Sequence, residues 1–140
     1  MITEDYVSFE TAKLLKEKGF DVYGDGSFGS SIKIWMEYSP VGKIKDISTA
    51  SPSPKAYPAP TLQMAMKWLR EVYHLFIGCE PRLSFTDFYW ITANIYRVRK
   101  KSSLYHTEDV DDYHCVASCD SHSYEGACEA AIKYCLENLI

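Results

Sequence analysis

The densest group of side chains that could perform chemistry lies in the last third of the chain and consists of His114, Cys115, Cys119, His122 and Cys128. Zinc sites use Cys and His pairs that tight turns bring together at spacings of two to four residues. Residues 113–119, however, have the pattern of a β-strand, along which Cys115 and Cys119 would lie about 13 Å apart. Because that separation prevents two residues from sharing one ion, we predict no bound metal, and a zinc site would need residues 113–119 to form a loop instead. No cofactor is predicted.

The five cysteines do not suggest a disulfide framework. An odd number is typical of a reducing compartment. Cys128 and Cys135 lie on one expected helix, about 10 Å apart along its axis, which is too far to bridge. Cys79 stands alone in the sequence. We therefore interpret most of the cysteines as small buried apolar residues with free thiols.

A glycine-rich segment, Gly-Asp-Gly-Ser-Phe-Gly at residues 24–29, matches the G-x-G-x-x-G pattern. The dinucleotide-binding version needs a helix after the glycines, but a strand pattern follows here. The protein-kinase glycine loop fits this setting better, yet the other kinase motifs are absent. We interpret the segment as a hairpin turn. No nucleophile elbow, Walker loop or His-Glu-x-x-His occurs either, so no catalytic residue can be named, although an unrecognised enzyme remains an alternative.

The charge balance, with 15 Lys+Arg against 19 Asp+Glu and a net charge of −4, disfavours a protein that mainly coats nucleic acid. The acidic residues between 108 and 112 are interpreted as solvated loop charge. A local basic group follows the aromatic residues at 89, 90 and 96 and consists of Arg97, Arg99, Lys100 and Lys101. A basic strand end beside aromatics can hold single-stranded nucleic acid, and the alternative is a charged hairpin end that keeps the sheet soluble.

The hydrophobic periodicity predicts helices over residues 9–18, 61–73 and 123–139, with N-caps at Ser8, Thr61 and Ser123. Strand patterns cover residues 20–23, 31–38, 44–47, 74–77, 86–98 and 113–119. This order predicts an α+β fold, in which a largely antiparallel β-sheet is packed by three helices. We expect a single domain over residues 1–140, with a Pro-rich loop at 39–60 inside it.

The strand at residues 31–38 alternates between apolar and polar side chains. Ile32, Ile34, Met36 and Tyr38 share one face, which we expect to be buried. The other face, expected to meet solvent, holds Ser31, Lys33, Trp35 and Glu37. An exposed tryptophan is typical of binding interfaces, so Trp35 is the candidate contact for a partner protein.

The chain has no apolar run of the roughly 20 residues that a membrane helix needs, and its first residues are acidic rather than basic and then apolar. We therefore expect a cytoplasmic protein without a membrane partner.

Three segments resemble one family. They read VSFETAKLLKEKGF at 7–20, PAPTLQMAMKWLREV at 58–72 and SYEGACEAAIKYCLENL at 123–139. In this order they resemble small uncharacterised proteins that are common in gut Bacteroides genomes and in their phages or prophages. The resemblance implies a bacterial cytoplasm and a mobile-element context. The family has no known activity, so no functional residue is implied.

These observations together favour a small cytoplasmic protein-interaction module of phage or prophage type, without catalytic activity, that binds an unidentified protein. Two alternatives stay open: a nucleic-acid-binding accessory protein that uses the basic strand end at 97–101, and an unrecognised enzyme. Association with a second copy of the chain through an edge strand is a further alternative.

Overall fold

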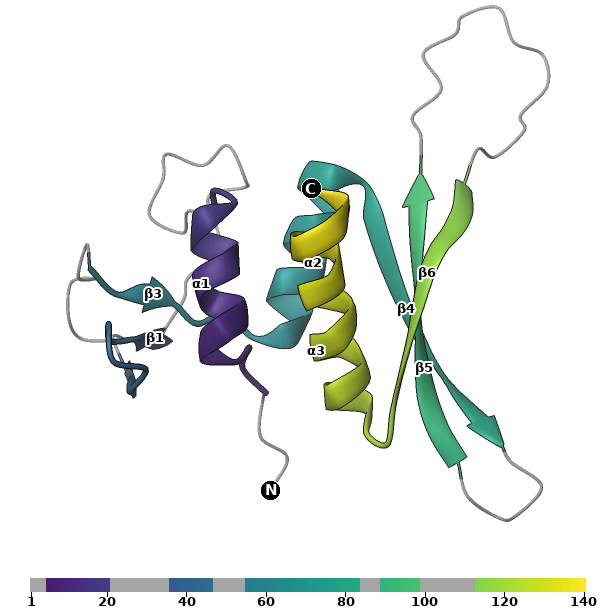
Figure 1. Ribbon diagram of the computed structural model, residues 1–140, viewed down its shortest axis with the longest axis horizontal. Helices are drawn as coiled ribbons and strands as arrows, with labels where there is room; N and C mark the ends of the chain where they lie inside the picture. Colours follow the sequence, from purple (N-terminus) through teal and green to yellow (C-terminus); the bar gives the residue numbers. More distant parts are fainter. Residues whose placement is uncertain (1–4, 21–35, 47–54, 84–88, 99–112) are drawn as a thin grey trace, which may run out of the picture.

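The computed structural model describes residues 5–20, 36–46, 55–83, 89–98 and 113–140. In these ranges three helices accompany two antiparallel three-stranded sheets (Figure 1). The helices are α1 (Phe9–Glu17), α2 (Leu62–Tyr73) and α3 (Tyr124–Tyr134), and α3 continues into the π-helical turn η1 (Cys135–Leu139). The small sheet has the order β2-β1-β3 and consists of β1 (Met36–Tyr38), β2 (Ile44–Asp46) and β3 (Tyr57–Pro58). The large sheet has the order β4-β5-β6 and consists of β4 (Leu75–Leu83), β5 (Tyr89–Val98) and β6 (Tyr113–Ser121). The α+β class is confirmed.

Local sequence signals set the ends of the helices. The three expected N-caps are confirmed: the side-chain oxygens of Ser8, Thr61 and Ser123 each accept a hydrogen bond from the backbone N–H three residues later. At the end of α1, Gly19 has φ of +90°, and the N–H of Phe20 donates to the carbonyl of Leu15 at 2.9 Å. This is the Schellman arrangement, which needs a left-handed residue that glycine adopts without strain.

The large sheet is covered on one side by α2 and α3, and we call this side its inner face (Figure 1). Ile91, Ala93 and Ile95 of the central strand β5 point to it and are buried. They pack in one core cluster with the apolar residues of the helices, which include Leu69 of α2 and Ile132 of α3. Burial of this apolar area is the main term that holds the helices on the sheet.

Strand β4 is longer than the sequence predicts. The segment 74–77 was expected to end before Gly78 and Pro81, but β4 pairs with β5 through both residues as far as Leu83. Proline lacks an N–H and is tolerated in strands at a sheet edge, and β4 is an edge strand of the large sheet. The same rule accounts for Pro58, which lies in the edge strand β3 of the small sheet.

The small sheet corrects one expectation about burial. Glu37 was assigned to a solvent face, but its exposed fraction is 2%, whereas its neighbours Met36 and Tyr38 are half-buried. Glu37 lies opposite Lys45 of β2, whose Nζ is 3.6 Å from the Glu37 carboxylate. The buried carboxylate is therefore paired with a cation whose side chain is 59% exposed. Alternation shows which residues share a face, but it does not show whether that face is open to water.

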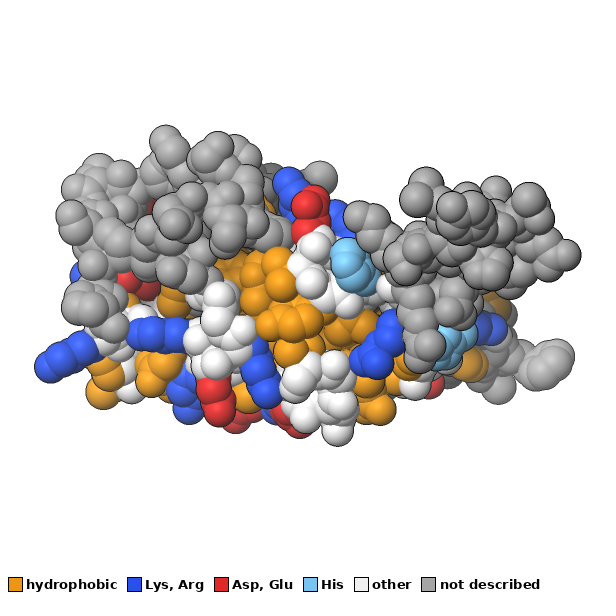
Figure 2. All heavy atoms as spheres, turned by 90° about the horizontal axis from the view of Figure 1, so that it is seen from above, with side chains coloured by type: hydrophobic (Ala, Val, Ile, Leu, Met, Phe, Trp, Pro, Cys, Tyr) orange, Lys and Arg blue, Asp and Glu red, His pale blue; other side chains and the backbone are white. Residues whose placement is uncertain are grey.

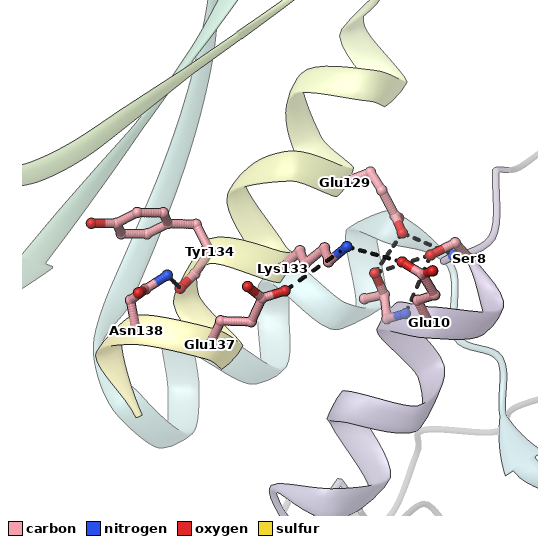
Figure 3. A network of polar contacts seen from close by, with 8 residues as sticks. Ser8, Glu10, Glu129, Lys133, Tyr134, Glu137 and Asn138 are labelled. Carbon is pink, nitrogen blue, oxygen red and sulfur yellow. Dashed lines mark hydrogen bonds and ion pairs between the residues drawn. The ribbon is translucent and has the colours of Figure 1, made fainter.

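A network of polar contacts joins α1 to α3 (Figure 3). The carboxylate of Glu129 accepts hydrogen bonds from the Ser8 N–H at 3.0 Å and from the buried Thr11 hydroxyl at 2.6 Å. In a capping box a Glu within the same helix would accept the N-cap N–H, and here Glu129 of α3 takes that place. Nearby, Lys133 pairs with Glu10 at 2.9 Å, and this contact lowers the pKa of the Glu10 carboxyl.

Candidate interaction surface

The side of the large sheet turned away from α3 is the candidate interaction surface, and we call it the outer face. In the described part of the chain, no helix packs on this side (Figure 1). Strand alternation places these residues on it: Phe76, Gly78, Glu80 and Arg82 of β4; Trp90, Thr92, Asn94 and Tyr96 of β5; and Cys115, Ser118 and Asp120 of β6. The surface is therefore built from all three strands.

Hydrogen bonds run across the middle of the outer face. The Ser118 hydroxyl donates to the Asn94 side-chain oxygen at 2.7 Å, and the Asn94 amide donates to Glu80 at 3.3 Å. Glu80 in turn lies 3.0 Å from the Arg82 guanidinium. These contacts connect β6, β5 and β4 in one row. Side chains held in this way lose little further conformational freedom when a partner binds.

An aromatic pair lies beside this polar row. Phe76 of β4 is directly opposite Tyr96 of β5, and the exposed fraction of Phe76 is 39%. The ring of Tyr96 also reaches over Gly78, 4.0 Å from the position that a Cβ would take there. Because glycine has no side chain, the space above it is filled from the neighbouring strand. The outer face thus combines an exposed aromatic ring with ordered polar groups.

The charges of the outer face are predominantly acidic. Glu80 and Asp120 contribute two carboxylates, whereas Arg82 is the one cationic side chain among the described outer-face residues. The Thr92 hydroxyl donates to Asp120 at 2.7 Å, which fixes that carboxylate in place. Because Arg82 pairs with Glu80, the described outer-face residues carry one more carboxylate than cations, and this balance disfavours the phosphates of nucleic acid here.

Of the basic residues predicted to contact nucleic acid, Arg97 is described by the structure, whereas Arg99, Lys100 and Lys101 lie outside the described residues. Arg97 is half-buried, and its guanidinium donates to the carbonyl of Leu139 at 3.2 Å. Lys18 likewise donates to the carbonyl of Ile140 at 3.1 Å. Cations at a helix C-terminus satisfy its last carbonyls and oppose the helix dipole, which gives Arg97 a structural role at this end.

Figure 2 views the molecule from the end at which the C-terminus lies, and hydrophobic side chains gather in the middle of that view. The carboxyl ends of the helices meet here, because the Tyr73 hydroxyl of α2 donates to the carbonyl of Lys18 that follows α1. Phe20, Trp68 and Tyr73 stack edge to face, with ring centroids 5.3 and 5.1 Å apart. Trp68 is buried, so this aromatic group is part of the core.

The His and Cys residues that open the sequence analysis do not gather around one point. Within the described ranges, which include all five of them, no three His, Cys, Asp or Glu side chains are placed as ligands of one metal ion. Cys115 is exposed and contacts the Ala117 carbonyl and the Ser118 hydroxyl. Cys119 points to the inner face, where burial raises the pKa of its thiol.

The structure reveals one cysteine contact that the sequence analysis missed. The Sγ atoms of Cys79 on β4 and Cys128 on α3 are 3.3 Å apart. The pKa of the Cys128 thiol is raised to about 12, mainly by burial and to a smaller extent by the hydrogen bond with Cys79. The two residues are 49 positions apart in the chain. No spacing rule could have paired them, since the contact depends on how α3 sits on the sheet.

Several predicted features lie outside the described residues. These are Trp35, the glycine-rich segment at 24–29 and the acidic residues at 108–112. Trp35 as a protein contact therefore stays a prediction. In the parts of the chain that are described, no helix is both long enough and apolar enough to cross a membrane.

Comparison with known proteins found no similar protein. No protein-family model, no curated protein and no solved structure matches this chain. The resemblance to proteins of gut Bacteroides and their phages stays a prediction, and the function proposed below depends on the geometry of the outer face.

Proposed function

We propose that this chain is a protein-interaction module and that a partner protein docks on the outer face of the large sheet. The observation that carries the proposal is the exposed ring of Phe76 on a sheet face that no described helix covers. Aromatic residues surrounded by ordered polar groups are typical of the positions that dominate binding energy in protein interfaces. In keeping with the resemblance described above, we place this activity in the bacterial cytoplasm.

The chemistry of the face specifies the kind of partner. An apolar side chain of the partner would pack against Phe76 beside Tyr96, where the two rings lie opposite each other. A Lys or Arg of the partner would meet Glu80 and Asp120, whose carboxylates give the face its negative charge. Such charge complementarity raises the association rate and selects among partners more than it raises affinity.

The test replaces the exposed ring with a charge. Phe76→Glu places a carboxylate within the proposed interface, and Val41→Glu makes the matched change at a site that is 79% exposed in the turn between β1 and β2. Tagged wild-type and variant proteins are used for affinity capture from bacterial lysate, followed by quantitative mass spectrometry. We expect Phe76→Glu to reduce recovery of a salt-stable partner at least about tenfold and Val41→Glu to leave it unchanged.

Two results would contradict the proposal. One is a partner that both variants retain, and the other is a partner that both variants lose equally. Thermal melts of the two variants accompany the capture, because a loss of binding counts only where the fold is kept. Light scattering of the purified wild-type protein shows whether the recovered partner is a second copy of the chain.

The same experiment distinguishes the nucleic-acid alternative. Nucleic acid recovered with the wild-type protein should disappear as salt rises, since its affinity depends on the release of counterions from phosphate. Arg97→Gln should then weaken binding to a single-stranded oligonucleotide in fluorescence anisotropy. Arg97→Gln also removes the hydrogen bond to the Leu139 carbonyl. If the anisotropy is the same for this variant and the wild type, Arg97 has a structural role alone.

A further inference from the structure

The contact between Cys79 and Cys128 joins two different layers of the fold. Cys79 is half-buried on the inner face of the edge strand β4, and Cys128 is fully buried in the second turn of α3. Their Sγ atoms, 3.3 Å apart, need to approach by about 1.2 Å to reach the length of a disulfide bond. We propose that Cys79 and Cys128 are a redox-active pair, which a disulfide oxidant closes to an intramolecular disulfide.

The two sulfurs have different surroundings, which sets the order of the steps. The pKa of the Cys128 thiol is raised to about 12, so this group is protonated near neutral pH and is a poor first nucleophile. Cys79 is the more accessible of the two, and its thiolate attacks a disulfide R–S–S–R. One sulfur of the oxidant bonds to Cys79, and the other leaves as a thiolate that takes up a proton.

The second step uses Cys128. Its sulfur loses a proton and attacks the Cys79 sulfur of the mixed disulfide, and the remaining oxidant sulfur leaves as a thiol. In total the two cysteines lose two hydrogens, and one molecule of oxidant disulfide becomes two thiols. Cys128 can perform this step because its sulfur already touches that of Cys79.

The bond would tie an edge strand to the helix that covers the sheet. Among the described elements, β4 is hydrogen-bonded to β5 alone in the large sheet. A link across a separation of 49 residues restricts the unfolded chain strongly. We expect the oxidised protein to melt about 10 °C above the reduced protein. The pairing does not depend on what binds the outer face.

The experiment uses the full chain treated with oxidised glutathione or with dithiothreitol and then alkylated. Digestion with trypsin and with a protease that cleaves after glutamate places Cys79 in the peptide 72–82, because the bond between Glu80 and Pro81 resists cleavage. Cys128 falls in the peptide 126–129, apart from Cys115 and Cys119. After oxidation we expect these two peptides to be recovered as one linked species. After dithiothreitol we expect both to be recovered alkylated, together with the lower melting temperature.

Cys119→Ser is the matched control for Cys79→Ser. The two residues lie in one row of the sheet, paired with Ala93 from either side, and both are half-buried. Cys79→Ser should abolish the oxidant-dependent rise in melting temperature, whereas Cys119→Ser should retain it. Because Cys79 is half-buried, its variant remains testable even if Cys128→Ser fails to fold.

Three outcomes would overturn the proposal. The first is a glutathione adduct that persists on Cys79 while Cys128 is alkylated. The second is a link between another pair of cysteines in place of this one. The third is a rise in melting temperature that survives in Cys79→Ser.

Discussion

The inner and outer faces of the large sheet are built from the same three strands, but they carry different kinds of residue. On the inner face, small and apolar side chains such as Ala93 and Ile95 meet Ala127, Cys128 and Ala131 of α3, and all five are fully buried. Small residues on both sides let the helix backbone approach the sheet closely. On the outer face, the side chains hydrogen-bond to one another or stay exposed.

One strand can serve two purposes because its side chains alternate between the two faces of the sheet. The residues of one set bury apolar area and hold the fold. Those of the other set are free to change with little cost to stability, which is what a binding surface requires.

Removing residues 123–140 is expected to unfold the protein. The deletion takes away α3 and η1, whose buried residues cover Ile91, Ala93 and Ile95. Exposing an apolar sheet face costs several kcal/mol at about 25 cal/mol per Å², which is comparable to the whole stability of a small domain. Circular dichroism should show no cooperative melt, and a transition near that of the full chain would refute the inner-face assignment.

Ile95→Ala should lower the free energy of unfolding by about 3 kcal/mol. Ile95 is fully buried at the centre of β5, and truncation loses its transfer free energy and leaves a cavity beneath α3. Urea unfolding of the folded variant measures the change. A loss below about 1 kcal/mol would mean that the inner face is loosely packed.

Ser118→Ala on the outer face should lower the free energy of unfolding by less than about 1 kcal/mol. The variant loses the hydrogen bond to Asn94, but Ser118 is exposed, so water replaces the missing partner. The same urea assay gives the comparison with Ile95→Ala. An equal cost at both positions would remove the distinction between the two faces.

Much of the fold was predictable because the signals for it are local. The N-caps at Ser8, Thr61 and Ser123 and the stop at Gly19 depend on side chains within a few residues of each helix end. The helix starts and the strands β2, β5 and β6 therefore followed from spacing alone, whereas β3 was not expected, and the strand predicted at 20–23 lies mostly outside the described residues. The end of β4 did not, since whether Pro81 stops a strand depends on its place in the sheet, and that place is set by distant residues.

The candidate surface was less predictable than the fold. The sequence analysis pointed to Trp35 and to the basic residues 97–101, whereas the proposed surface centres on Phe76 and the row from Ser118 to Glu80. No motif marks these residues, because they become neighbours only through the register of β4, β5 and β6. The one signal available in the sequence was the apolar set Leu75, Ile77 and Cys79 at every second position along β4, which places Phe76 on the opposite face.

Capping and periodicity act over short distances along the chain, so the starts of the helices and the α+β order of the elements follow from the sequence alone, whereas the change from α3 to a π-helical turn at Cys135 does not. Tertiary structure decided which sheet face stays open, that Glu37 is buried beside Lys45, and that Cys79 meets Cys128. These contacts depend on packing between segments far apart in the chain, and side chains gain the free energy of burial only after the segments have met.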